Sequence, residues 1–291
     1  MLLAALLFAT MGVCIKFASA HFNSFEIVCY RGLFGVVFLW WVTRSRGVSL
    51  RTSVPAMHVW RSIVGTLSLT AWFYSIAVLP LATAMTLNYM SSIWIAAFLL
   101  GGALLLPGRD IALLRQGPLF ATVLAGFAGV AMVLRPTLQP DQFVGALVGL
   151  LSGVTSALAY LQVSALSRVG EPETRTVFYF SLGAVLAGAL GMVFTGVSTW
   201  HWPSALWLLP IGLLAVLGQL CMTRAYASGA TLVVANLQYS GIVFAGIYSL
   251  TIFGDRLPLI GWLGMALIIV SGVTATVLRE RSVPHAPAEE H

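Results

Sequence analysis

The chain has 291 residues, of which 59% are hydrophobic and only 8% are charged, with a net charge of +6 and a mean hydropathy of +0.95. Soluble globular domains carry about 25% charged residues, so this composition excludes a soluble fold. We therefore expect an integral membrane protein.

Apolar runs long enough to cross a bilayer recur along the whole chain. A free backbone group finds no partner in lipid, and continuous apolar runs favour helices over alternating strands. We expect an all-α protein with ten transmembrane helices. In chain order the runs are 2–20, 24–43, 59–79, 81–104, 116–134, 143–167, 176–196, 205–227, 230–252 and 258–278.

The arginines predict the orientation of these spans. With the N-terminus inside, the outside loops hold only Arg135 and Arg256, and the inside loops and their edges hold the larger set. By the positive-inside rule both termini are cytoplasmic, in a bacterial-type inner (plasma) membrane, with a disordered tail at 280–291. Topology explains the positive charge, so no nucleic-acid partner is expected. The inside set is Arg44, Arg46, Arg51, Arg61, Arg109, Arg115, Arg168, Arg175, Arg279 and Arg281.

Two distant stretches match each other. ATAMTLNYMSS, residues 82–92, superposes on ATLVVANLQYS, residues 230–240, at a spacing of 148, and a second match overlays the run from Gly117 on the run from Gly261. Together they place spans 3–5 over spans 8–10. Because five is odd, the second copy enters the membrane inverted, which is typical of secondary transporters. We expect two inverted five-helix repeats, 1–136 and 137–279, around a central cavity.

Three segments resemble a known family. SFEIVCYRGLFG, residues 24–35, has Glu26 followed five positions later by Arg31; residues 72–98 contain an LPLA turn; and IFGDRL, residues 252–257, has Asp255 where that family usually has Glu. The chain is similar to the ten-span EamA-type permeases of the drug/metabolite transporter superfamily, and most similar to their amino-acid exporters. The resemblance implies a basket of ten helices and export of small metabolites.

Polar residues on matching faces of spans 4 and 9 are the first candidates for substrate contact. An unpaired amide in lipid costs several kcal/mol, so these side chains either bond between packed helices or wall a polar cavity. Mid-span tyrosines and Gln219 join them as pocket candidates. The expected substrate-binding residues are Tyr74, Asn88, Tyr89, Ser92, Tyr160, Gln219, Asn236, Tyr239 and Ser240.

Charged residues within spans are rare and often functional. Lys16 and Glu26 face each other across the first hairpin and are able to pair; alternatively, Lys16 or Arg31 meets a substrate carboxylate at the outer mouth, as part of a gate. No carboxylate falls in the middle of a span. This absence argues against a proton relay and a cation pocket, and favours zwitterionic or neutral cargo.

These observations predict a secondary transporter that exports small metabolites by alternating access, above all amino acids with aromatic or other apolar side chains. The alternative cargo is a drug-like or nucleoside-type metabolite. An intramembrane enzyme is disfavoured, because all the histidines fall in loops or tails, and nothing resembles a channel filter. We expect no catalytic residues, metal or cofactor. The expected partners are the substrate and the lipid bilayer, and a closed basket is able to work as a monomer.

Overall fold

The computed structural model describes most of the chain as a bundle of helices. The described residues are 1–45, 47, 49–95, 97–98, 121–122, 124–126, 128–129, 132, 142–229, 234–235, 237–255 and 258–282. No strand occurs among them, so the predicted all-α class is confirmed. Most of the expected fifth span lies outside the described residues.

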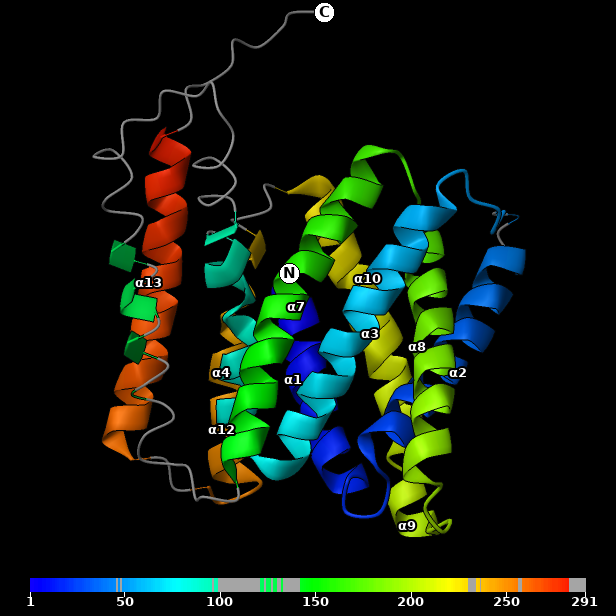
Figure 1. The fold of residues 1–291 in the computed structure, drawn as a ribbon, viewed down its shortest axis with the longest axis horizontal. Helices are drawn as coiled ribbons and strands as arrows, with labels where there is room; N and C mark the ends of the chain where they lie inside the picture. Colours follow the sequence, from blue (N-terminus) through cyan, green and yellow to red (C-terminus); the bar gives the residue numbers. More distant parts are fainter. Residues whose placement is uncertain are drawn as a thin grey trace, which may run out of the picture.

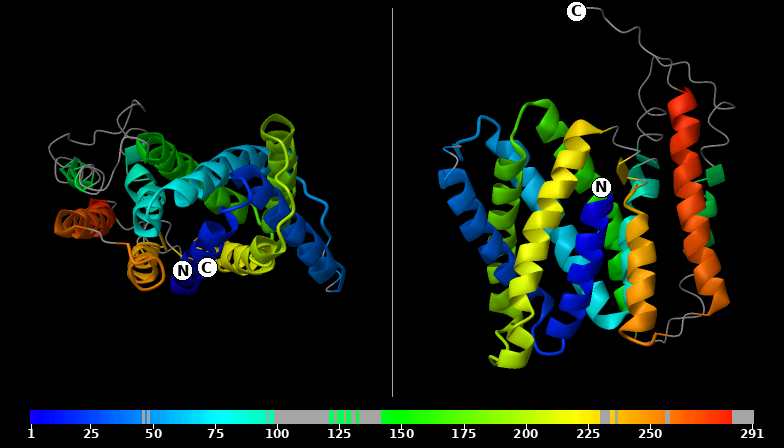
Figure 2. Two further views of the ribbon diagram at one scale, coloured as in Figure 1. Left: turned by 90° about the horizontal axis from the view of Figure 1, so that it is seen from below. Right: turned by 180° about the vertical axis from the view of Figure 1, so that it is seen from behind.

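Short connections join the helices from α1 to α4 and from α7 to α10 (Figure 1). Their bounds are α1 Leu2–Ala18, α2 Ser24–Ser45, α3 Pro55–Val78, α4 Leu81–Tyr89, α7 Phe143–Arg168, α8 Glu173–Thr195, α9 Trp202–Ala205, α10 Leu208–Ser228, α12 Ser240–Thr251 and α13 Leu259–Ser282. Figure 2 shows the same helices from below and from behind.

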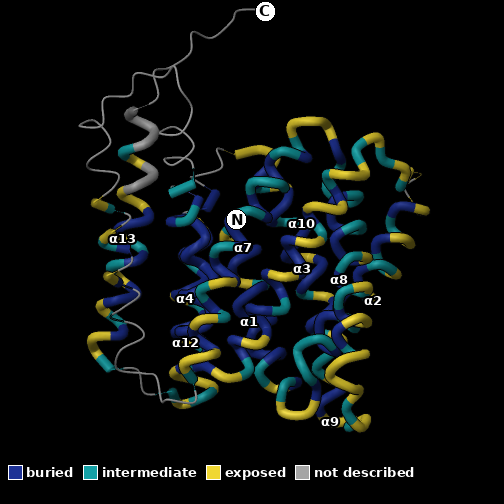
Figure 3. Tube along the Cα trace, in the orientation of Figure 1, coloured by how far each residue is buried: buried dark blue, intermediate teal, exposed yellow. Residues whose placement is uncertain are grey.

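The outward faces of the bundle are apolar. Among the described residues, α2, α7, α8 and the segment Trp202–Ser228 are long and apolar enough to cross a membrane. Leu186, Leu190 and Val193 of α8 are all more than 60% exposed, and exposed positions lie on the outer sides of the helices (Figure 3). Such side chains are stable against lipid rather than water, so this is a membrane-embedded bundle. Ten spans are consistent with it.

Contacts between helices pair the two halves of the chain. The packing of α3 on α7 has a counterpart in α10 on α1, that of α4 on α7 in α12 on α1, and that of α3 on α8 in α10 on α2. The remaining large contacts, α2 with α8 and α4 with α12, each join equivalent helices. An inverted repeat would produce this pattern, because its axis exchanges the members of each pair.

The fourth and ninth spans are interrupted at matching positions. α4 ends at Tyr89 and helix resumes after Met90, while a turn at Gln238 and Tyr239 precedes α12. The 148-residue spacing of the sequence match superposes Met90 on Gln238. The expected span over 81–104 therefore contains a turn at Met90. Short i-to-i+3 hydrogen bonds close both turns: the Ile93 N–H donates to the Met90 carbonyl and the Gly241 N–H to the Gln238 carbonyl, each at 2.9 Å.

α2 and α8 pack closely against each other. A Cβ added at Gly32 would lie 2.8 Å from the Ser181 carbonyl oxygen, and one at Gly188 would lie 2.7 Å from the backbone nitrogen of Cys29. A larger residue would force the backbones apart, because real Cβ atoms do not approach backbone this closely. Small residues at such contacts let membrane helices pack tightly.

Glu26, which is fully buried, fastens one end of the α2–α8 pair. Its Oε1 accepts the Ser198 N–H at 2.8 Å, and its Oε2 accepts the Ser198 hydroxyl at 2.6 Å and the Asn23 N–H at 2.7 Å. The Asn23 side chain in turn accepts the Glu26 N–H at 3.0 Å, which completes a capping box at the start of α2. Of the two alternatives that the sequence left open for Lys16, pairing with Glu26 is not found: Lys16 Nζ donates to the Leu79 carbonyl at 2.6 Å.

Glu171 fastens the opposite end in an equivalent way. Its Oε1 accepts the Thr52 hydroxyl at 2.7 Å, and its Oε2 accepts Arg175 Nη1 at 3.0 Å and lies 3.3 Å from His58 Nε2. Glu171 follows Glu26, and Ser198 follows Thr52, by nearly the same number of residues that separates the matching stretches of the two halves. Burial raises the pKa of Glu171, but hydrogen bonds from Thr52, Arg175 and His58 and the Arg175 charge outweigh it, so the pKa lies below its ordinary value.

Candidate functional site

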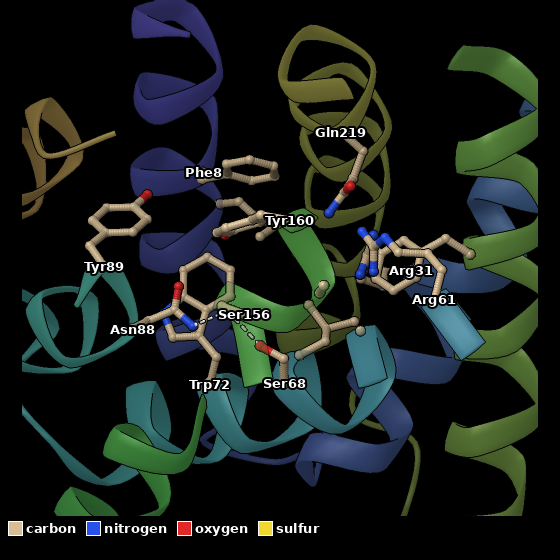
Figure 4. Close-up of a pocket in the computed structure, with 15 residues that line it drawn as sticks. Phe8, Arg31, Arg61, Ser68, Trp72, Asn88, Tyr89, Ser156, Tyr160 and Gln219 are labelled. Atoms are coloured by element: carbon tan, nitrogen blue, oxygen red, sulfur yellow. Dashed lines mark hydrogen bonds between the residues drawn. The ribbon is translucent and has the colours of Figure 1, made fainter. Parts of the chain in front are cut away.

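A small cavity lies between the two halves of the bundle, with walls from α1, α2, α3, α4, α7, α8 and α10 (Figure 4). Its volume of about 40 Å³ holds only a few water molecules. A metabolite therefore enters only when the surrounding helices move apart.

The amide of Asn88 and the hydroxyls of Ser68 and Ser156 line one side of the cavity. Asn88 of α4 is 2% exposed, and its Nδ2 donates to the Ser152 hydroxyl at 3.1 Å and to the Ser156 hydroxyl at 3.0 Å. The Ser156 and Ser68 hydroxyls are 2.6 Å apart. The network joins α3, α4 and α7, so Asn88 packs helices together and also lines the cavity.

Aromatic rings form another wall. Tyr160 of α7 stacks on Tyr226 of α10 with ring centroids 5.4 Å apart, and its hydroxyl accepts Gln238 Nε2 at 2.8 Å. Phe8 and Trp72 meet edge to face at 6.3 Å. Rings with nearby polar donors suit an organic ligand that has both an apolar body and polar groups.

Two arginines supply the charge of the cavity. Arg31 of α2 and Arg61 of α3 are each 3% exposed. Their guanidinium carbons lie 5.3 Å and 4.2 Å from the centroid of the Phe180 ring. In Figure 4 their nitrogens lie side by side and face the same space as Gln219. The cavity is therefore strongly positive on this side.

Arg61 was missed by sequence reasoning, which counted it among the charges at the inner edge of span 3. The structure buries it in the cavity instead, because α3 begins at Pro55 and carries Arg61 almost two turns into the bundle. Gly65, one turn further on, was the available signal. A Cβ there would overlap Nη1 of Arg61, so the glycine makes room for the guanidinium.

The structure brings together five of the predicted site residues. Asn88, Tyr89, Tyr160, Gln219 and Arg31 line the cavity.

The other candidates lie elsewhere. Ser92 donates to the Ala235 carbonyl at 2.9 Å and joins the two interrupted spans. Ser240 donates to Leu237 within its own turn at 2.7 Å, and Tyr239 lies against Gly272. Tyr74 is 39% exposed on the outside of α3. Asn236 lies outside the described residues, and the contacts of Lys16 and Glu26 are those described above.

No group of three His, Cys, Asp or Glu residues gathers as metal ligands would in the part of the chain that the structure describes. The polar groups of the cavity are amides, hydroxyls and guanidiniums, which bind ligands by hydrogen bonds and charge. The arrangement is therefore suited to holding an organic molecule.

Comparisons with known proteins agree with this architecture. Residues 143–277 match the EamA-like transporter family. The pseudopaline exporter CntI of Pseudomonas aeruginosa is 34% identical over 247 residues, which cover 83% of this chain and 82% of that protein. A riboflavin transporter of Rhizobium johnstonii is 29% identical, with coverage of 89% and 81%. An S-adenosylmethionine uptake transporter of Rickettsia bellii is 22% identical, with coverage of 91% and 88%.

A crystal structure shares the fold at a TM-score of 0.67 and 20% identity, covering 97% of this chain and 96% of the other. The named relatives are transporters, not enzymes, and they carry different small molecules. The chain belongs to the EamA-like transporter family of the drug/metabolite transporter superfamily and is a multi-pass bacterial inner-membrane transporter of small molecules.

Proposed function

We propose that this protein exports small organic metabolites by alternating access, and that the cavity between its two halves is the substrate site. The observation that carries the proposal is the composition of the cavity wall. Residues of α1 to α4 face residues of α7, α8 and α10 across one polar space. Movement of one half against the other would open such a site to either side of the membrane in turn.

The interrupted fourth and ninth spans support this mechanism. Discontinuous helices at corresponding positions of two inverted repeats typically lie at the substrate site of a secondary transporter. Here Tyr89 precedes one interruption and lines the cavity, and Gln238 in the other donates to Tyr160 of the cavity wall. Movement at either turn would therefore displace side chains that contact the substrate.

Export with both termini in the cytoplasm is the direction we propose. Similarity to a pseudopaline exporter favours it, and the arginine distribution supports the orientation. Amino acids with an apolar or aromatic side chain are the first cargo to test, because the cavity places rings beside hydrogen-bond donors. Nucleoside-type metabolites are the second cargo, favoured by the similarity to riboflavin and S-adenosylmethionine transporters.

Flux through proteoliposomes tests the proposal. Purified protein would be reconstituted and uptake measured for labelled amino acids, nucleosides and organic acids. Asn88→Ala would be compared with wild type, and Tyr74→Ala, on the outer surface of the same bundle, is the matched control. We expect saturable uptake of at least one solute, lost in Asn88→Ala and kept in Tyr74→Ala. Equal uptake by all three proteins, or no saturable uptake of any solute by folded protein, would overturn the proposal.

A further inference from the structure

We infer that Arg31 and Arg61 form an anion clamp and that the exported substrate carries a carboxylate; this rests on the proposed function. Both side chains are only 3% exposed, and both come from helices that line the cavity. Within the described residues, Nε and Nη1 of each guanidinium have no hydrogen-bond partner. Four buried, charged donors are thus left free beside an empty space.

Burying a cation without a partner is costly, since its lost hydration is not replaced. Phe180 offsets part of this cost, because the guanidiniums lie 5.3 Å and 4.2 Å from the centroid of its ring. A ring accepts no conventional hydrogen bond in the guanidinium plane, however. The two like charges also repel each other across this single ring. The arrangement is therefore incomplete without an anion.

Within the part of the chain that the structure describes, no internal anion completes it. None of the residues that line the cavity is Asp or Glu. Glu26 and Glu171, the carboxylates at the two ends of the α2–α8 pair, accept hydrogen bonds from Ser198 and Asn23 and from Thr52 and Arg175. The anion that satisfies the two arginines must come from the cargo.

The geometry of guanidinium favours a carboxylate, whose two oxygens match its parallel N–H groups. Two guanidiniums with no carboxylate opposite them suit an acid whose negative charge exceeds its positive charge. The sequence favoured zwitterionic or neutral cargo because no carboxylate falls in the middle of a span. The position of Arg61 in the cavity moves the preference to organic acids. Asn88, Ser68 and Gln219 add neutral polar contacts for the rest of the molecule.

Binding of defined acids tests the clamp. Succinate and glutamate would be compared with succinamide and glutamine, their uncharged and less charged counterparts, by thermal unfolding of the detergent-solubilised protein and by flux in proteoliposomes. We expect at least one of the acids to stabilise the wild type, and its amide counterpart to have no effect. Arg31→Met and Arg61→Met should weaken that binding about tenfold or more. Arg61→Lys keeps the charge but lacks the parallel N–H donors of a guanidinium, so it should retain more acid binding than Arg61→Met.

Arg44→Met is the matched control, because Arg44 is an exposed arginine on the same helix as Arg31. It should leave acid binding unchanged. A second measurement needs no ligand: removing an unpartnered buried charge should keep or raise the unfolding temperature. If Arg31→Met and Arg61→Met both lower it, the arginines are structural and the inference fails.

The outcomes separate this inference from the proposed function. Saturable flux of neutral or zwitterionic solutes that depends on Asn88 but survives Arg61→Met would sustain the transporter and overturn the clamp. Acid binding that requires both arginines, without any flux, would sustain the clamp and overturn the transport proposal. Flux of an acid that is lost in Arg61→Met and kept in Arg44→Met would support both.

Discussion

Arg31 and Glu26 lie five residues apart on α2, and both are buried, yet their surroundings are opposite. Glu26 accepts three hydrogen bonds, from Ser198 and Asn23. Arg31 has two free donor atoms beside an empty cavity. The same contrast holds between Glu171 and Arg61. The carboxylates at the ends of the α2–α8 pair are satisfied by the fold and hold it together, and the arginines between them are left for a ligand.

The largest effect is expected when the two arginines are given a carboxylate partner within the protein, because they then resemble the satisfied Glu26 and Glu171. Gln219 faces the same space as both guanidiniums in Figure 4, so Gln219→Glu should place a carboxylate near the position where the substrate anion would bind. We expect flux of organic acids to fall about a hundredfold, because an internal anion outcompetes the ligand. The unfolding temperature should rise at the same time. Gln219→Met is the control; if it lowers flux equally, the added charge is not the cause.

Removing a satisfied carboxylate should act on stability instead. Glu26→Gln turns two accepting oxygens into one acceptor and one donor, which opposes the N–H groups of Ser198 and Asn23. We expect the free energy of unfolding to fall by about 2 kcal/mol. KM, measured on the folded fraction in proteoliposomes, should stay unchanged. A changed KM with unchanged stability would show that Glu26 acts on the substrate and does not stabilise the fold.

A smaller effect is expected from displacing one arginine without removing it. Gly65→Ala adds a Cβ where Nη1 of Arg61 lies, so the guanidinium must shift within the cavity. We expect KM for an organic acid to rise about fivefold, an effect near 1 kcal/mol. Gly170→Ala, made in the loop after α7, should leave KM unchanged. Equal KM values for Gly65→Ala and wild type would show that the position of Arg61 does not matter.

Single hydroxyls at the two ends allow a matched test of the symmetry. Ser198 donates to Glu26 and Thr52 to Glu171, at 2.6 Å and 2.7 Å. We expect Ser198→Ala and Thr52→Val each to cost about 1 kcal/mol in unfolding free energy, and their effects to add because the two sites lie at opposite ends of the helix pair. Chemical denaturation of both single variants and the double variant would measure this.

The smallest effect expected is a pH dependence at Glu171. Its pKa in the folded protein lies below the ordinary value of 4.5. Its contribution to stability is therefore fully present above pH 4.5 and lost as pH falls through the folded pKa. The unfolding temperature should be level near neutral pH and drop below about pH 4.5, with a shallower drop in Glu171→Gln. Parallel curves for the two proteins would exclude Glu171 as the source.

Part of the site was predictable because polar residues are costly in apolar runs. Asn88, Tyr160, Gln219 and Arg31 stood out in the sequence for this reason and all line the cavity. Arg61 did not, because its depth depends on where α3 begins and how it packs on α8. Ser92 and Ser240 match in sequence but not in contacts, since one bonds across to Ala235 and the other within its own turn.

Sequence alone determined that the chain is an all-helical membrane protein, because apolar run lengths are a local property; its internal matches predict two related halves. Tertiary structure decided which charges are satisfied. Glu26 and Arg31 look alike as buried charges in a sequence, and only the position of Ser198, Phe180 and the cavity distinguishes them. Partners that satisfy a buried charge come from distant segments, so they appear only once the helices have packed.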